Sequence, residues 1–267
     1  MNLLALFNQF EGLADQENLT RTSSRREAFS SIGKIMGKTA AIGLPLGAAL
    51  LAPTPVRAQG GGTSVVDVLN FALLLEYLEA EYYVTGLSSN NLLSGDIRQK
   101  IILISQHETS HVELLKSAIS SSGGTPITSP TFDFTAGGTF GDVFSNMQTF
   151  LAVAQAFEDT GVRAYKGQAA NLMSSDSALT TALQIHSVEA RHASEIRRIR
   201  GSKGWITNAT NTSAPAADAV YAGEDNIIQL GVDAAALTTV SRDRVTEAYD
   251  EPLTMAEVNA IAGLFIV

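Results

Sequence analysis

The chain has 267 residues, of which 45% are hydrophobic and 17% charged, so it can bury a sizeable core in one large domain or two small ones. The formal net charge of −9 argues against a nucleic-acid partner, because phosphate binding needs clustered Lys and Arg. The absence of Cys excludes thiolate metal sites, iron–sulfur clusters and disulfides, so any metal site in this chain must use oxygen and nitrogen ligands.

The first 58 residues have the order of an export signal. Arg25 and Arg26 come first, an apolar run over residues 39–52 follows, and a small-residue cleavage pattern ends at Ala58. Paired arginines are typical of signals for the twin-arginine machinery, which exports folded proteins. The apolar run is too short and too interrupted by Gly and Pro to form a stable membrane span. We therefore predict a signal over residues 1–58 and an exported protein of the periplasm or cell envelope; an uncleaved anchor or a chance arginine pair stays open.

Residues 59–63 form a predicted flexible joint, and residues 64–203 have the periodicity of four amphipathic helices. The predicted helices cover about 64–87, 94–123, 139–173 and 175–200. Short loops join the first helix to the second and the third to the fourth, whereas about fifteen residues containing Pro and Gly join the second to the third. This connectivity predicts an all-α four-helix bundle with one long crossover.

The remaining residues, 204–267, form a C-terminal extension of different composition. The segment 207–217 is rich in Asn, Thr, Ser, Ala and Pro and predicts a loop, and residues 220–235 predict an ordered but irregular chain. A short amphipathic helix around residues 257–261, capped by Thr254, is predicted near the end. We expect this extension to pack on the outside of the bundle rather than to bind a partner.

The two predicted helical hairpins carry the same set of polar residues. Each has a Glu, a Tyr seven residues later, and a Glu-x-x-His motif about thirty residues after the first Glu. The first copy consists of Glu76, Tyr83, Glu108 and His111, and the second consists of Glu158, Tyr165, Glu189 and His192. The two Glu residues are 32 residues apart in the first copy and 31 apart in the second, so the hairpins have almost equal length.

The Glu and His residues of this repeat lie in the middle of apolar helix stripes, where an unpaired carboxylate would cost several kcal/mol on burial. Four carboxylates and two neutral imidazoles balance the charge of two divalent cations, which removes this cost. Glu and His at positions i and i+3 share one helical face, so each His can bind one metal while its Glu bridges to the other. This is the ligand set of a dinuclear centre in a four-helix bundle. We therefore predict two divalent ions, Fe or Mn with Zn also compatible, bound by Glu76, Glu108, His111, Glu158, Glu189 and His192.

Five further residues are candidates for roles beside these ligands. Tyr83 and Tyr165 could donate a hydrogen bond to a ligand Glu or donate an electron, or they could be ordinary aromatic core. Glu79 lies three residues after Glu76 and could replace it as a ligand. His107 is expected to touch a ligand from outside the ligand set. His186 could orient a ligand carboxylate or be an ordinary core histidine.

His107, Glu108 and His111 also match the His-Glu-x-x-His signature of zinc metalloproteases. Such short matches often arise by chance, and no motif for a third zinc ligand follows. Helical phase places His107 one residue away from the inward stripe, and the second Glu-x-x-His would have no role in a protease. A zinc protease is therefore the least favoured alternative.

Residues 75–83, 189–193 and 249–254 resemble exported bacterial ferritin-like domain proteins, a group often labelled desiccation-related, and the resemblance covers roughly residues 64–265. The wider superfamily, with bacterioferritin, rubrerythrin and manganese catalase, shares two Glu and two Glu-x-x-His. The resemblance implies a ferritin-like bundle with a dinuclear site at the six residues named above. The absence of Cys excludes the rubredoxin-type site of rubrerythrin in this chain. The long extension differs from cage-forming ferritins, so we expect no cage, while a smaller oligomer stays open.

The resemblance does not choose an activity, because the superfamily includes oxidases, peroxidases, catalases and iron stores. We expect redox chemistry on O₂ or H₂O₂, in a peroxidase-, catalase- or ferroxidase-like role in envelope stress protection. The alternative is a non-enzymatic envelope protein that stores metal or is stabilised by it.

Overall fold

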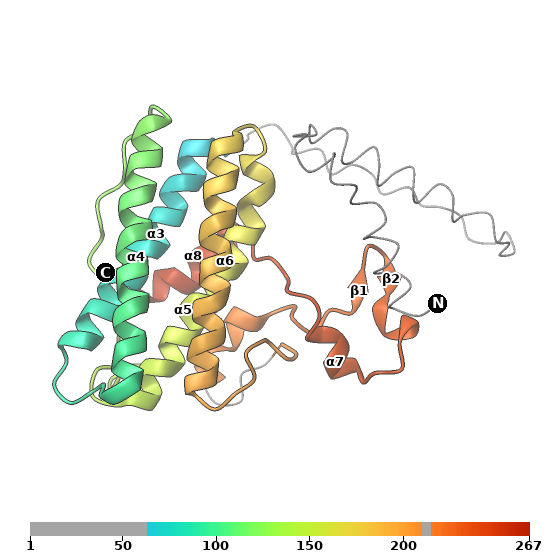
Figure 1. The fold of residues 1–267 in the computed structure, drawn as a ribbon. Coiled ribbons are helices and arrows are strands. Elements are labelled where there is room, and N and C mark those ends of the chain that lie inside the picture. Colours follow the sequence, from blue (N-terminus) through green and yellow to red (C-terminus); the bar gives the residue numbers. More distant parts are fainter. Residues whose placement is uncertain (1–62, 210–214) are drawn as a thin grey trace, which may run out of the picture. The chain divides into compact units, whose positions relative to one another are not determined.

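The computed structural model describes residues 63–209 and 215–267. Four long helices form the bundle in Figure 1, namely α3 (Val65–Ser88), α4 (Gly95–Ser121), α5 (Met147–Gln168) and α6 (Asp176–Ile199). Helix α3 packs along α4, and α5 packs along α6. The connection from α4 to α5 is long, so the predicted all-α bundle with one crossover between its second and third helices is confirmed. The predicted export signal at 1–58 and most of the predicted joint lie outside the described residues.

Helix α5 begins later than the sequence predicted. Its first residue is Met147, whereas the predicted start was Thr139, and the preceding residues form consecutive turns. Gly137 and Gly138 adopt positive φ angles of 64° and 95°, which a helix does not use. The side chain of Asn146 then caps α5 by accepting a hydrogen bond from the Gln148 backbone. The prediction was wrong because apolar residues of these turns also pack on the core and imitate a helical stripe.

The other end of α5 and the crossover also differ from the prediction. After Gln168 the chain tightens into the 3₁₀ helix η2 (Ala169–Leu172), so α5 itself stops before the predicted residue 173. The crossover covers residues 122–146 and is longer than the predicted fifteen or so residues. It is held at one point by the C-terminus, because Phe132 pairs with Ile266 in an isolated β-bridge.

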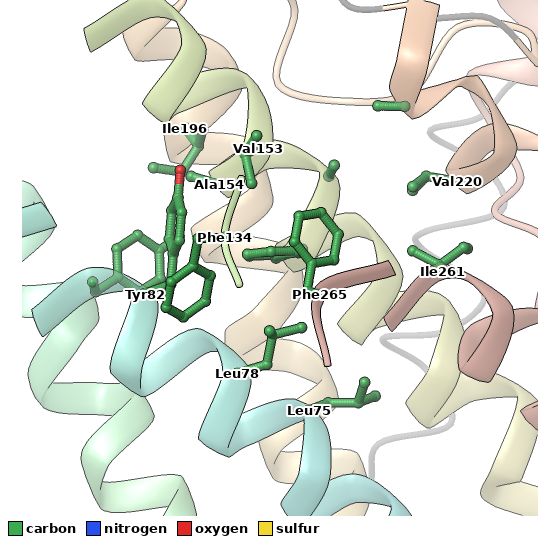
Figure 2. Close-up of a cluster of buried hydrophobic side chains, with 14 of the residues drawn as sticks. Leu75, Leu78, Tyr82, Phe134, Val153, Ala154, Ile196, Val220, Ile261 and Phe265 are labelled. Atoms are coloured by element: carbon green, nitrogen blue, oxygen red, sulfur yellow. The ribbon is translucent and has the colours of Figure 1, made fainter. Parts of the chain in front are cut away.

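Two hydrophobic clusters fill the bundle on either side of a polar layer. The cluster in Figure 2 includes Tyr82 of α3, which stacks on Phe150 of α5 with ring centroids 4.8 Å apart. The other cluster includes Leu73 of α3 and Leu115 of α4. The residues of the predicted metal site fall between these clusters along each helix, so both sides of the polar layer are apolar. An uncompensated charge in this layer would be costly.

The C-terminal extension contains more regular structure than the single predicted helix. Its elements are η3 (Pro215–Tyr221), β1 (Ile228–Gln229), β2 (Val232–Asp233), η4 (Ala234–Leu237), α7 (Arg242–Thr246), α8 (Met255–Ala262) and η5 (Gly263–Phe265). Thr254 and Glu257 form a capping box at the start of α8, where the sequence placed a helix. Helix α8 contacts α3 and α5, so the extension lies against the bundle.

Helix α5 is buried on almost every side because the extension covers its outer face. Arg163 is only 1% exposed and donates hydrogen bonds to the backbone oxygens of Val220, Ala222 and Glu251. Among the described residues, no helix is both long and apolar enough to cross a membrane.

Candidate metal centre

Each long helix contributes one Glu of the repeat to the polar layer, and α4 and α6 each add one His. The Glu side chains are fully buried and the His side chains nearly so. The six residues are Glu76 on α3, Glu108 and His111 on α4, Glu158 on α5, and Glu189 and His192 on α6. The structure therefore brings all six predicted residues together in one layer.

These residues form two overlapping groups of potential metal ligands. One group is Glu76, Glu108, His111 and Glu189, and the other is Glu108, Glu158, Glu189 and His192. In each group the ligand atoms all lie within 4.8 Å of one another. Glu108 and Glu189 belong to both groups, and a carboxylate has two oxygens with which to serve two ions. The geometry is thus that of two cation positions with two shared carboxylates.

Both imidazoles present the same nitrogen to the carboxylates. His111 Nδ1 lies 3.1 Å from Glu76 Oε2 and 2.9 Å from Glu108 Oε2. His192 Nδ1 lies 2.7 Å from Glu108 Oε1 and 3.3 Å from Glu158 Oε2. Each Nδ1 could therefore bind a metal, which would leave the proton of the neutral imidazole on Nε2.

Tyr83 and Tyr165 link the two hairpins crosswise. The Tyr83 hydroxyl donates to Glu158 Oε1 at 2.5 Å, and the Tyr165 hydroxyl donates to Glu76 Oε1 at 2.5 Å. Each Tyr thus binds the Glu of the opposite hairpin, not the Glu of its own helix. Burial, followed by the negative charge of the partner carboxylate, raises the pKa of both hydroxyls well above its usual value. Both tyrosines are also part of the hydrophobic clusters, so the two alternatives from the sequence coexist.

His107 contacts the cluster through His192. Its Nδ1 lies 2.9 Å from His192 Nε2, on the side of that ring facing away from the carboxylates. No potential ligand group among the described residues contains His107, and this does not favour a zinc site shared by His107 and His111. His107 is instead placed to receive the Nε2 proton of His192.

His186 lies outside the cluster. It is half-buried and lines a cavity with Lys166 and Asp250, between the bundle and the extension. Its Nε2 has no hydrogen-bond partner among the described residues, and no ligand carboxylate contacts it. His186 was predicted either to orient a ligand carboxylate or to be an ordinary core histidine. This position matches neither role.

Glu79 is a fifth carboxylate in the same layer. It is 2% exposed, and its Oε2 has no hydrogen-bond partner among the described residues. Burial raises its pKa well above the usual value, and the charges of Glu189 and Glu158 raise it further. The sequence placed Glu79 beside Glu76 as a substitute ligand, but the structure buries both. The predicted balance between four carboxylates and two divalent cations therefore leaves out Glu79.

Without metal, the imidazoles and carboxylates of the cluster share protons. Burial would lower the pKa of His192, but the carboxylates of Glu158 and Glu108 beside the ring raise it to about 11. Burial raises the pKa of Glu76 to about 7 against the hydrogen bond from His111. Burial would also raise the pKa of Glu108, but the neighbouring imidazoles of His111 and His192 lower it to about 2. A metal ion that binds here must displace the imidazole protons.

The buried donor atoms fit a cation better than they fit one another. Oxygens of Glu79, Glu158 and Glu189 have no hydrogen-bond partner among the described residues. His192 Nδ1 lies close to Glu108 but lacks the geometry of a hydrogen bond. Buried polar groups are normally paired, so a set that converges without pairing could hold a cation. Carboxylate oxygen and imidazole nitrogen are ligands that suit Fe and Mn.

A second buried polar network lies beside the cluster and was not predicted from the sequence. Arg197 Nη2 lies 2.5 Å from Asp159 Oδ2, and the Tyr221 hydroxyl donates to the same oxygen at 2.7 Å. Asp159 follows Glu158 directly, so Tyr221 connects the extension to the helix that carries a Glu of the cluster. No repeat or motif marks these residues, because their partners come from distant parts of the chain.

Comparison with known proteins agrees with this geometry. The sequence model of the ferritin-like domain family matches residues 64–202, which include all four long helices and all six clustered residues. A search of curated proteins found no match to the chain.

Proposed function

The chain belongs to the ferritin-like domain family, and on this premise we propose that its buried cluster binds two divalent metal ions, Fe or Mn, for redox chemistry on O₂ or H₂O₂. The observation that carries the proposal is the pair of overlapping ligand groups that share Glu108 and Glu189. Two redox-active ions held by shared carboxylates supply two-electron chemistry when bound. A peroxidase-, catalase- or ferroxidase-like activity is the specific form that we propose.

The residues of the chain have distinct tasks in this centre. Glu108 and Glu189 would hold both ions, and His111 and His192 would each bind one ion through Nδ1. Tyr83 and Tyr165 orient the two remaining carboxylates by hydrogen bonds, and both hydroxyls keep their protons because burial raises their pKa. The apolar clusters on either side exclude water from the layer.

A non-enzymatic role is the second candidate. All four repeat carboxylates are fully buried, and a closed site suits metal storage or structural stabilisation. We also propose that the protein is exported to the periplasm or cell envelope and acts in stress protection. This part rests on the arginine pair and cleavage pattern within residues 1–58.

Metal content and turnover test the proposal together. The exported protein should contain about two Fe or Mn ions per chain by elemental analysis and should consume H₂O₂ or O₂ when loaded. Glu108→Ala should lose both ions and all turnover, because Glu108 belongs to both ligand groups. Glu81→Ala, which removes an exposed acid of α3, is the matched control and should change neither.

The possible outcomes separate the candidates. Two metal ions without turnover under either Fe or Mn would exclude the enzyme and leave storage or stabilisation. One zinc ion per chain would instead revive the protease alternative. A chain without metal would overturn the centre altogether.

A further inference from the structure

The two halves of the centre are not equivalent at one inward position. Residues of α3 and α5 correspond at an offset of 82, which pairs Glu76 with Glu158 and Tyr83 with Tyr165. The same offset pairs Glu79 with Gly161. Glu76, Glu79 and Tyr83 share one face of α3, because positions i, i+3 and i+7 of a helix are neighbours. One half therefore has a carboxylate where the other half has no side chain.

Gly161 leaves space for Glu189 beside the fifth carboxylate. A Cβ at this position would lie 2.9 Å from Glu189 Oε2 and 3.4 Å from Glu79 Oε1. An Ala at this position would therefore force the end of the Glu189 side chain to shift, and its methyl group would come into contact with Glu79. Gly in a helix interior costs roughly 0.5–1 kcal/mol relative to Ala, so its presence here opposes helix stability. The opening toward Glu189 and Glu79 gives this glycine a function.

Glu79 belongs to neither group of potential ligands as its side chain stands, but it has the burial and the unpaired oxygen that a ligand needs. It is 2% exposed, its Oε2 has no hydrogen-bond partner among the described residues, and an oxygen of the shared Glu189 is its neighbour across Gly161. We propose that Glu79 is a fifth carboxylate ligand of the metal centre and that Gly161 leaves room for Glu189 beside it. The inference rests on the proposed function, because it requires the same two metal ions.

The fifth carboxylate changes the charge that the centre prefers. Five carboxylates and two neutral imidazoles carry five negative charges, which match one divalent and one trivalent ion. Four carboxylates would match two divalent ions. Glu79 should therefore favour oxidation of one ion and lower the reduction potential of the centre, since buried charge is stabilised only by compensation.

Metal content and reduction potential test the proposal without an activity assay. Glu79→Gln keeps the shape of the side chain and removes its charge. It should retain two ions per chain, bind the weaker one about tenfold less tightly or worse, and show a more positive midpoint potential. Glu81→Gln removes the same charge from an exposed position two residues away and should leave both quantities unchanged.

Gly161→Ala provides a second test at the opposite helix. The added methyl group should strengthen the helix in the metal-free protein, where the end of Glu189 is free to shift. It should weaken metal binding in the loaded protein, because it displaces Glu189. A Gly→Ala change at an exposed helix position would strengthen the helix without changing metal affinity, so only position 161 tests the two effects together.

Three results would overturn the inference. Wild-type affinity and midpoint potential in a Glu79→Gln protein that holds two ions would show that Glu79 is not a ligand. Unchanged metal affinity in Gly161→Ala would remove the role of the glycine. A wild-type chain that binds no metal would instead overturn the proposed function, and this inference with it.

Discussion

The two helical hairpins have the same polar pattern but different surroundings. Residues 81 and 163 occupy equivalent positions, two residues before each cross-linking Tyr. Glu81 is exposed, whereas Arg163 is 1% exposed, and its Nε lies 2.9 Å from Glu224 Oε1. The difference arises because the C-terminal extension covers α5 at this position. The repeat thus determines the residues of the polar layer, while the sequence outside the repeat determines the environment of the outward residues.

The largest predicted effect separates these equivalent outward positions. Arg163→Ala should reduce the free energy of unfolding by about 3–5 kcal/mol, because it leaves the buried carboxylate of Glu224 without a charged partner. Glu81→Ala should stay within about 0.5 kcal/mol of the wild type, since its side chain is exposed. Urea denaturation of both metal-free variants measures the difference. Equal effects at the two positions would contradict the proposed role of the extension.

The next prediction concerns pH, which acts on the ligands of both hairpins. The folded-state pKa of Glu76 and His192 is raised, to about 7 and about 11, so both groups stabilise the metal-free fold at low pH. That stability is lost as pH rises, between about 4.5 and 7 for Glu76 and between about 6.5 and 11 for His192. Within these ranges the free energy of unfolding falls by about 1.4 kcal/mol per pH unit for each group. The metal-free protein should therefore melt at a lower temperature at pH 8 than at pH 5.

Metal should reverse this trend. The ions need deprotonated ligands, so their binding stabilises the fold more at pH 8 than at pH 5. Melting curves recorded with a chelator and with Fe or Mn measure both trends. The same pH dependence in the presence and absence of metal would exclude the cluster as its source.

Removing the crosswise hydrogen bonds one at a time tests whether Tyr83 and Tyr165 contribute equally to stability. Tyr83→Phe and Tyr165→Phe each remove one hydrogen bond to a buried carboxylate, and each should cost about 1.5–3 kcal/mol of stability in the metal-loaded protein. Similar losses are expected because both bonds measure 2.5 Å. Thermal denaturation of the two variants and of the double variant measures this. A loss confined to one of them would mean that only one hairpin depends on its Tyr.

The smallest predicted effect concerns the outer nitrogen of the imidazoles. His107 of α4 faces His192 Nε2, whereas the equivalent residue of α6 is Val188, at an offset of 81. His107→Ala should weaken metal binding about tenfold, because it removes the acceptor that orients His192. Val188→Ala should leave metal affinity nearly unchanged, since Val has no polar group to offer His111. Competition with a coloured chelator measures both affinities, and equal losses would show that packing rather than the hydrogen bond is responsible.

The sequence predicted the polar layer well because helical periodicity is local. Glu108 and His111 lie on one face whenever their segment is helical, and the same holds for Glu189 and His192. The six residues therefore had to meet once four helices packed their apolar stripes together. The start of α5 was predicted less well, since turns at Gly137 and Gly138 present apolar residues to the core as a helix would.

By itself, the sequence determined the four bundle helices, the place of the crossover and the six clustered residues, because each depends on spacing within a segment. Tertiary structure alone decided that each Tyr binds the Glu of the other hairpin and that Arg163 is buried. It also decided that Glu79 enters the layer opposite Gly161. These features join residues that are distant along the chain. Helical periodicity predicts which face of a helix points inward, but not which residue of another segment will contact that face.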